Sequence, residues 1–234
     1  MIPLYDVNPT RRFPAVTVAL IAVNVVVYLW QVLVLPATGM SVAEWCYVAG
    51  VRPVEVIQHV DLPPSGGLPW WATLFTSQFV HGGLLHLGFN MLYLWIFGNN
   101  VEDSMSRPRF LVFYLLCGLG AAAGQVLVDP TSAVPLVGAS GAIAGVLGAY
   151  FVLFPRARVL TLVPLFLFFP VFEMPAWVLL VAWFVLQWLA GLSSLGSSQP
   201  GGVAYFAHVG GFLTGLALVW LFARRRRRRA PVVW

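Results

Sequence analysis

The chain has 234 residues, of which 60% are hydrophobic and only 9% are charged, and its formal net charge at pH 7 is +5. Together with a mean hydropathy of +0.86, this composition excludes an ordinary soluble globular domain. The 22 glycines and 17 prolines interrupt long apolar runs, where they are typical of helix ends and of close helix contacts. The sequence therefore predicts an all-α polytopic membrane protein.

Six apolar windows follow one another along the chain, each near the length of about 20 residues that crosses the hydrocarbon core. They lie at 15–35, 84–101, 110–128, 137–154, 176–191 and 203–223. No small-residue cleavage pattern follows the first window, so we interpret it as an uncleaved span. Pro164 and Pro170 interrupt a further apolar stretch at 159–173. We expect that stretch to be a bent, partly interfacial connector.

The arginines indicate the orientation of the spans, because cytoplasmic loops collect positive charge. The chain has no lysine, and if the spans number six, all arginines but one lie on the same side: Arg11, Arg12, Arg107, Arg109, Arg156, Arg158 and Arg224–Arg229. Arg52 alone lies in the outer loop at 36–83. We therefore expect a cytoplasmic segment at 1–14, a membrane domain at 15–223 and a cytoplasmic basic tail at 224–234. A minimal six-span core with no recognisable organelle-targeting segment favours a bacterial cell membrane.

The six arginines after the last window suggest a partner of negative charge. Their position directly after a membrane span favours anchoring against anionic lipid headgroups over nucleic-acid binding. Cys46 and Cys117 fall in different parts of the predicted topology, so no disulfide framework is expected. The lipid bilayer is the partner that this part of the sequence predicts.

Four strongly polar side chains fall near the starts of predicted spans, where such groups are costly and suggest function. His86 and Asn90 are four residues apart in the second span and share a helical face. Ser140 lies in the fourth span and His208 in the sixth. Because these three spans all run inward from the outer surface, the four side chains are expected at a similar depth, within a few turns of that surface.

Two glycine pairs predict close contact between the fourth and sixth spans. Their small-xxx-small spacing lets two helix backbones approach closely, and the pairs are Gly141 with Gly145 and Gly211 with Gly215. Ser140 directly precedes the first pair and His208 lies three residues before the second. If the two glycine faces meet, the Ser140 hydroxyl meets the His208 imidazole.

A hydroxyl beside a neutral imidazole is a minimal activated nucleophile, because the imidazole takes its proton during attack and returns it to the leaving group. No aspartate lies in the spans to orient the base, so the pattern predicts a Ser140–His208 dyad rather than a triad. His86, Asn90 and the Ser140 backbone N–H are candidate oxyanion donors. Taken singly, each side chain is also typical of helix packing or interhelical hydrogen bonding, but their common depth favours a catalytic site.

Other kinds of site fit the sequence less well. "GASGA" lacks the second glycine of a G-x-S-x-G nucleophile elbow. No H-E-x-x-H occurs and no carboxylate accompanies His81 and His86, so a metal site is not expected. A proton-coupled transporter using His86 and His208 would have midplane carboxylates and repeated broken helices, which the sequence lacks.

Three segments, "HGGLLHLGFNMLYLWIFGNNVE", "GASGAIAGVLGAY" and "AHVGGFLTG", occur in this order on the second, fourth and sixth spans. Over about residues 73–223 the chain resembles the rhomboid family of intramembrane serine proteases. The resemblance implies a six-transmembrane-helix bundle in which Ser140 is the nucleophile, His208 the base, and His86 and Asn90 assist the oxyanion. It also implies supporting positions at His81, Gly138, Gly141, Gly211, Gly215 and Glu102, the last with a structural role.

The function implied by the resemblance is a serine endopeptidase, without a cofactor, that cleaves single-span transmembrane proteins near the outer membrane boundary. The alternative is a non-catalytic rhomboid-like protein that binds transmembrane helices, although such proteins typically lack the serine or the histidine. Two positions depart from the family pattern. The loop segment "PWWATLF" lacks an arginine, and Ala144 stands where some members have a tyrosine that stacks on the base.

Overall fold

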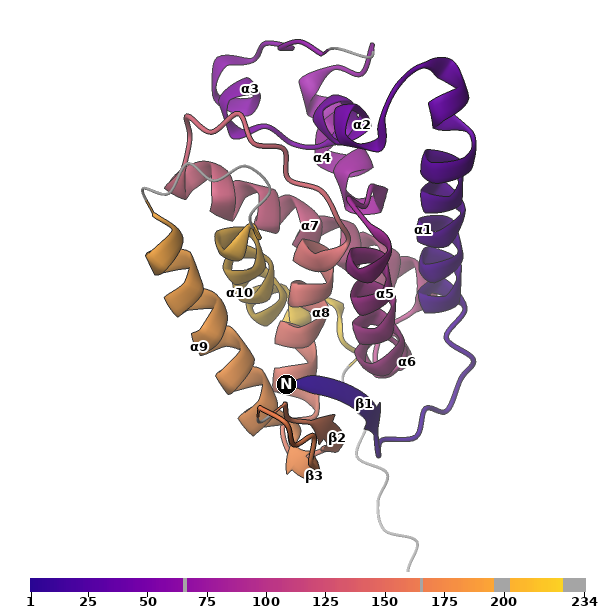
Figure 1. Cartoon of the computed structure of the whole chain (residues 1–234). Helices are drawn as coiled ribbons and strands as arrows, with labels where there is room; N and C mark the ends of the chain where they lie inside the picture. Colours follow the sequence, from indigo (N-terminus) through magenta and orange to yellow (C-terminus); the bar gives the residue numbers. More distant parts are fainter. Residues whose placement is uncertain (65–66, 165, 196–202, 225–234) are drawn as a thin grey trace, which may run out of the picture.

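The computed structural model describes residues 1–64, 67–164, 166–195 and 203–224, so the predicted basic tail lies outside the described residues from position 225 onward. The described chain is mostly helical, and its long helices form one bundle (Figure 1). The main helices are α1 (Ala15–Leu33), α5 (Leu84–Tyr93), α6 (Asn99–Asp103), α7 (Arg107–Val128), α8 (Ser140–Leu153), α9 (Ala176–Ser194) and α10 (Tyr205–Phe222). This agrees with the predicted helical membrane fold, and the protein is an integral membrane protein.

Every predicted span contains a helix, but the helices differ in length. Within the described ranges, α1, α7, α9 and α10 are long and apolar enough to cross a membrane. The second span runs through α5, the π-helical turn η3 (Leu94–Gly98) and α6, and is bent by 78° from the preceding helix at Trp70–Phe79. With only 14 residues, α8 is shorter than a bilayer crossing requires. The count of six spans stays a prediction.

Short helices lie between the first two predicted spans, at the end of the bundle opposite the sheet (Figure 1). They are η1 (Leu35–Thr38), α2 (Val42–Ala49), α3 (Pro53–Gln58), α4 (Trp70–Thr76) and η2 (Ser77–Phe79). Arg52 is buried here, forms an ion pair with Glu55 and donates hydrogen bonds to the carbonyl oxygens of Leu62 and Pro63. Although "PWWATLF" has no arginine, this loop therefore has a buried arginine anchor. Cys46 and Cys117 are both buried and free.

A carboxylate from the second span caps the first helix. The side chain of Glu102, only 4% exposed, accepts hydrogen bonds from the backbone N–H of Val16 and Thr17, at 3.0 and 2.8 Å, and from the Thr17 hydroxyl. These N–H groups have no partner within α1, and a negative charge is favourable at a helix N-terminus. Glu102 thus joins the start of α1 to the end of α6.

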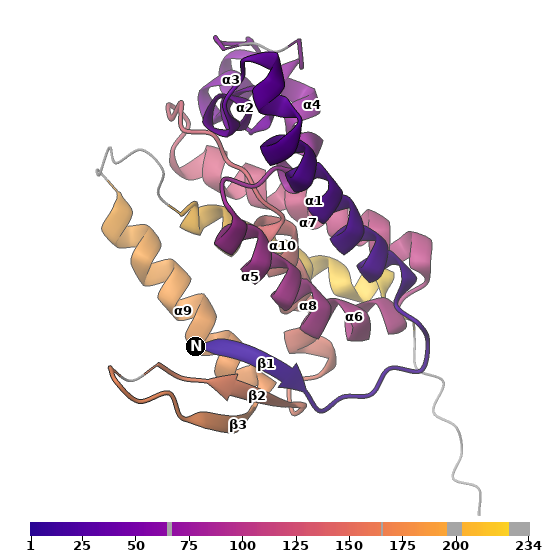
Figure 2. The ribbon, with the colours of Figure 1, turned by 45° about the vertical axis from the view of Figure 1, so that its right-hand side comes forward.

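A three-stranded antiparallel sheet, absent from the sequence prediction, lies where α9 begins (Figure 2). Its strands, in spatial order, are β1 (Ile2–Asp6), β2 (Arg158–Leu162) and β3 (Val171–Pro175). The stretch at 159–173, expected to be a bent connector, instead provides most of a hairpin. Alternation in β2 buries Val159 and Thr161, while Pro164 and Pro170 fall in the turn between the strands, where a missing N–H costs no ladder bond.

Asp6 fixes β1 to the helices, and we expect this contact to weaken as pH rises. Its buried carboxylate accepts hydrogen bonds from Asn100 and the Tyr150 hydroxyl, both at 2.8 Å. Burial raises the pKa of Asp6 from 3.8 to about 6, although the Tyr150 hydrogen bond opposes this change. The folded state therefore binds the proton more tightly than the unfolded state, so stability falls between about pH 4 and about pH 6.

Hydrogen exchange of the β1 amides, corrected for intrinsic rates, measures this effect at about pH 4 and about pH 7. We expect lower protection at the higher pH in the wild type. Asp6→Asn, which cannot ionise, should lose most of that difference. Equal pH dependence in the two proteins would contradict the role of Asp6.

Candidate active site

Ser140 and His208 are in direct contact in the structure. Ser140 is the first residue of α8 and His208 lies in the first turn of α10. The Ser140 Oγ atom is 2.8 Å from His208 Nε2. Both residues are partly exposed, so the pair is not sealed inside the bundle. A hydroxyl and an imidazole in this arrangement have the geometry of a nucleophile and its general base.

The glycine faces of α8 and α10 explain this proximity. A Cβ atom on Gly211 would clash with the carbonyl oxygen of Gly141, and one on Gly215 would clash with that of Gly145. The α10 pair therefore lets the α8 carbonyl groups approach its backbone, because only glycine leaves enough space there. This contact sets the distance between Ser140 and His208. The α8 pair faces α7 instead, where a Cβ atom on Gly141 or Gly145 would clash with Ala121 or Cys117, so the prediction that two glycine faces meet is correct only for α10.

The segment before α8 brings the second-span residues to the same place. Gly138 has φ +112°, a conformation that favours glycine, and its N–H donates to the carbonyl oxygen of Ser77 at 2.8 Å. A Cβ atom on Gly138 would clash with the imidazole ring of His86 and would lie 3.4 Å from Asn90 Nδ2. His86 and Asn90 thus lie against the backbone two residues before Ser140.

His81 is fully buried and holds Asn90 in position. Asn90 Nδ2 donates to His81 Nε2 at 3.0 Å, which leaves one amide hydrogen of Asn90 free of that contact. The backbone of His81 exchanges two hydrogen bonds with the side chain of Gln31 in α1, at 3.1 and 3.2 Å. Its ring centroid is 5.1 Å from that of His86. His81 therefore links the first helix to the candidate site.

Two side chains of α9 complete the surroundings of His208, and the sequence analysis missed both. Gln187 Oε1 is 2.7 Å from His208 Nδ1. The Trp183 ring lies beside the imidazole, with centroids 5.9 Å apart and planes tilted by 33°. The ring next to the base thus comes from α9, whereas α8 has the small Ala144. Gln187 is the one amide side chain in the window 176–191, a signal that could have identified it.

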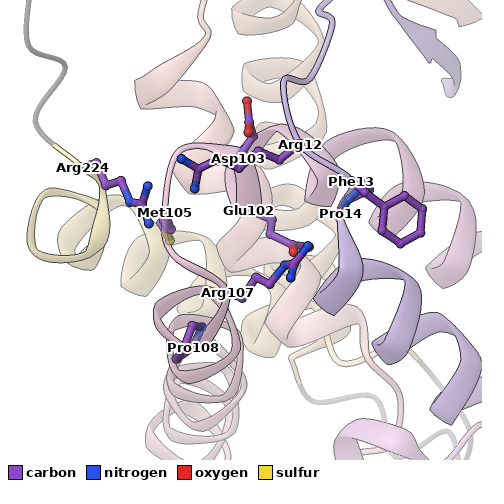
Figure 3. Close-up of a pocket in the computed structure, with 9 residues that line it drawn as sticks. All are labelled: Arg12, Phe13, Pro14, Glu102, Asp103, Met105, Arg107, Pro108 and Arg224. Carbon is purple, nitrogen blue, oxygen red and sulfur yellow. The ribbon is translucent and has the colours of Figure 1, made fainter.

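The described residues line one cavity beside the candidate site and another at the arginine-rich end of the bundle. A cavity of about 40 Å³ lies beside Ser140, lined by Ser77, Gln78, Gly138 and Gly141 among others. A larger cavity of about 390 Å³ lies at the other ends of the helices, where Arg12, Arg107 and Arg224 approach it from three segments (Figure 3). Its lining contains no serine, cysteine or histidine, so it holds no candidate nucleophile or imidazole base. Among the described residues, no group of three His, Cys, Asp or Glu is arranged to hold a metal ion.

The Rhomboid domain family model matches residues 69–225. Rhomboid protein 1, mitochondrial, from Saccharomyces cerevisiae is 31% identical over 172 residues, which cover 69% of this chain and 46% of that protein. Rhomboid protease GluP from Bacillus subtilis is 42% identical over 80 residues, 34% of this chain and 15% of that protein. Rhomboid-like protein 11, chloroplastic, from Arabidopsis thaliana is 34% identical over 169 residues. That match covers 67% of this chain and 54% of that protein. The matched region thus spans at most about half the length of each of these three relatives. The motifs, the helical bundle and the family match together establish that this chain belongs to the rhomboid family.

Proposed function

We propose that this protein is an intramembrane serine endopeptidase that cleaves single-span transmembrane proteins near the outer membrane boundary. The observation that carries the proposal is the 2.8 Å contact between Ser140 Oγ and His208 Nε2. Membership of a family whose members are usually serine proteases supports it, as does a bacterial relative that is named a protease. A non-catalytic member would have no need for this pairing of hydroxyl and imidazole.

The reaction begins when His208 Nε2 takes the Ser140 proton as Oγ attacks the scissile carbonyl carbon. The oxyanion of the tetrahedral intermediate is stabilised by the Ser140 backbone N–H together with His86 and Asn90. His208 then protonates the leaving amine, and the new N-terminus departs from the acyl-enzyme. A water molecule, for which the 40 Å³ cavity beside Ser140 has room, attacks the ester carbonyl carbon while His208 takes its proton. The bond from the acyl carbon to Ser140 Oγ then breaks, His208 returns the proton to Oγ, and the product departs with its new C-terminal carboxylate.

The position of the charges supports an orientation with both termini in the cytoplasm. Arg12, Arg107 and Arg224 gather at the end of the bundle where α10 ends, whereas Ser140 and His208 lie at the starts of α8 and α10. By the bias of positive charge toward the cytoplasm, Ser140 then faces the outer half of the bilayer. The proposed topology has six spans within 15–223, with the segments 1–14 and 224–234 in the cytoplasm. The proposed location is a bacterial cell membrane.

The substrate must present an extended peptide at this depth, because a hydrogen-bonded helix does not offer its carbonyl group for attack. Transmembrane segments with helix-destabilising residues near their outer end are therefore the proposed substrates. The test is incubation in proteoliposomes with a single-span reporter of this kind, followed by mass spectrometry of the products. A cut within the outer part of the span supports the proposal. A cut only in a soluble domain, or no cut by folded protein, contradicts it.

Asn90→Ala should reduce cleavage without abolishing it. The expected loss is about 10²-fold in kcat, the lower end of the usual cost of removing one oxyanion donor. Asn24→Ala is a matched control, because Asn24 is a buried α1 residue whose amide donates to the Leu20 carbonyl oxygen of its own helix. Steady-state cleavage of the reporter by both variants measures the effect. Equal kcat in the two would remove Asn90 from the oxyanion site.

A further inference from the structure

We infer that Gln187 is a positioning residue that holds His208 in the one tautomer able to accept the Ser140 proton. The inference deepens the proposed function and rests on it. Ser140 and His208 were expected to act as a dyad, because no aspartate lies in the spans. In the structure a neutral amide from α9 occupies the place where a triad has its third member.

The hydrogen-bond inventory of the two side chains determines the tautomer. Gln187 Oε1 can only accept, so its 2.7 Å contact places the imidazole proton on His208 Nδ1. Neutral imidazole has a single N–H, so Nε2 then presents a lone pair to Ser140 Oγ at 2.8 Å. The opposite tautomer would put N–H against the serine hydroxyl and leave the nucleophile without a base.

The environment explains why an amide suits this position. A carboxylate in a membrane helix is costly to bury, whereas an amide dipole is much less so. When His208 is protonated during attack, its Nδ1–H stays bonded to the amide oxygen, which favours the imidazolium without a permanent charge in the bilayer. Gln187 is also partly buried rather than directed wholly to lipid.

A second contact from the same helix restricts the ring. Trp183 and Gln187 are four residues apart and so share one face of α9. Trp183 lies beside the imidazole while Gln187 contacts its Nδ1 atom, so α9 restrains both the plane and the rotation of the ring. Figures 1 and 2 both show α9 along the flank of the bundle beside α10. The helix thus contributes to the site although it contains neither the nucleophile nor the base.

The test compares Gln187→Leu, which removes the oxygen that accepts from His208 Nδ1, with Gln187→Glu, which keeps an acceptor oxygen at that position. Gln125→Leu is the matched control, an identical substitution in α7 at a side-chain oxygen that has no hydrogen-bond partner among the described residues. We expect Gln187→Leu to lower kcat about 10- to 100-fold, the range found when the orienting partner of a metal-bound histidine is removed, with KM little changed. Gln187→Glu should recover most of the lost kcat, and Gln125→Leu should retain wild-type kcat.

Imidazole ¹⁵N NMR gives a readout that a merely structural role would not change. The His208 signals, assigned by comparison with His208→Ala, should show a protonated Nδ1 in the wild type and a mixture of tautomers in Gln187→Leu. Unchanged tautomer and kcat in folded Gln187→Leu would overturn the inference, as would loss of kcat in both Gln187 variants with the tautomer unchanged. If the wild type does not cleave, the proposed function fails, but the NMR comparison still decides whether Gln187 fixes the tautomer.

Discussion

Ser140→Ala is expected to reduce cleavage of a membrane-embedded reporter to background, a loss of about 10⁴- to 10⁶-fold in kcat. The substitution removes the Oγ atom that attacks the scissile carbonyl, and no other hydroxyl contacts the His208 imidazole among the described contacts. Alanine is a good helix former, so α8 should still begin at position 140. Product formation in proteoliposomes, measured over hours, gives the residual rate.

His208→Ala should lose as much activity as Ser140→Ala, because the two side chains act as a unit and the effects of such residues are not additive. Ser193→Ala is a suitable control, since Ser193 is an exposed α9 residue whose hydroxyl donates to the Ala190 carbonyl oxygen of its own helix. It should cleave like the wild type. Substantial activity in folded Ser140→Ala would mean that another residue is the nucleophile.

Gly215→Ala is expected to have the second largest effect. Its new Cβ atom would meet the Gly145 backbone, which unlike a flexible side chain cannot move aside cheaply. Separation of α8 from α10 should cost about 1–3 kcal/mol of stability, the usual range for overpacking. Because Ser140 and His208 lie on these two helices, a displacement of about 1 Å should also cost about 10²-fold in activity.

Thermal unfolding in detergent and the reporter assay together measure both consequences. Gly88→Ala in α5 is the control, because a Cβ atom there has nothing within 4 Å. The control should cleave like the wild type and be at least as stable, because alanine is favoured over glycine inside a helix. If Gly215→Ala also matches the wild type, the close contact between α8 and α10 does not set the geometry of the site.

Much of the candidate site could be predicted from the sequence, because polar side chains are rare within membrane spans and because the spacing of glycines shows where helices can pack closely. Polar side chains are expensive inside a span, so Ser140 and His208 stood out from an apolar background. The glycine pairs then indicated which two helices approach each other. The polar side chains and the glycine pairs are each visible within a single span. The expectation that Ser140 and His208 lie at a similar depth follows from counting the spans between them.

Gln187 and the sheet could not be derived in the same way. The sequence shows an amide in the fifth span but not the rotation of α9 about its axis, which decides whether Gln187 faces His208 or lipid. The sheet pairs Ile2–Asp6 with Arg158–Leu162, segments more than 150 residues apart. Strand pairing at that separation depends on the packed bundle, and short apolar runs do not distinguish strands from helix segments.

The most direct test of the central claim is labelling of the purified, detergent-solubilised protein with a fluorophosphonate probe. Mass spectrometry then locates the adduct, with His208→Ala as the control. An activated nucleophile predicts an adduct on Ser140 that is lost in the control. Absence of an adduct in protein shown to be folded would contradict the claim and favour a non-catalytic rhomboid that binds transmembrane helices.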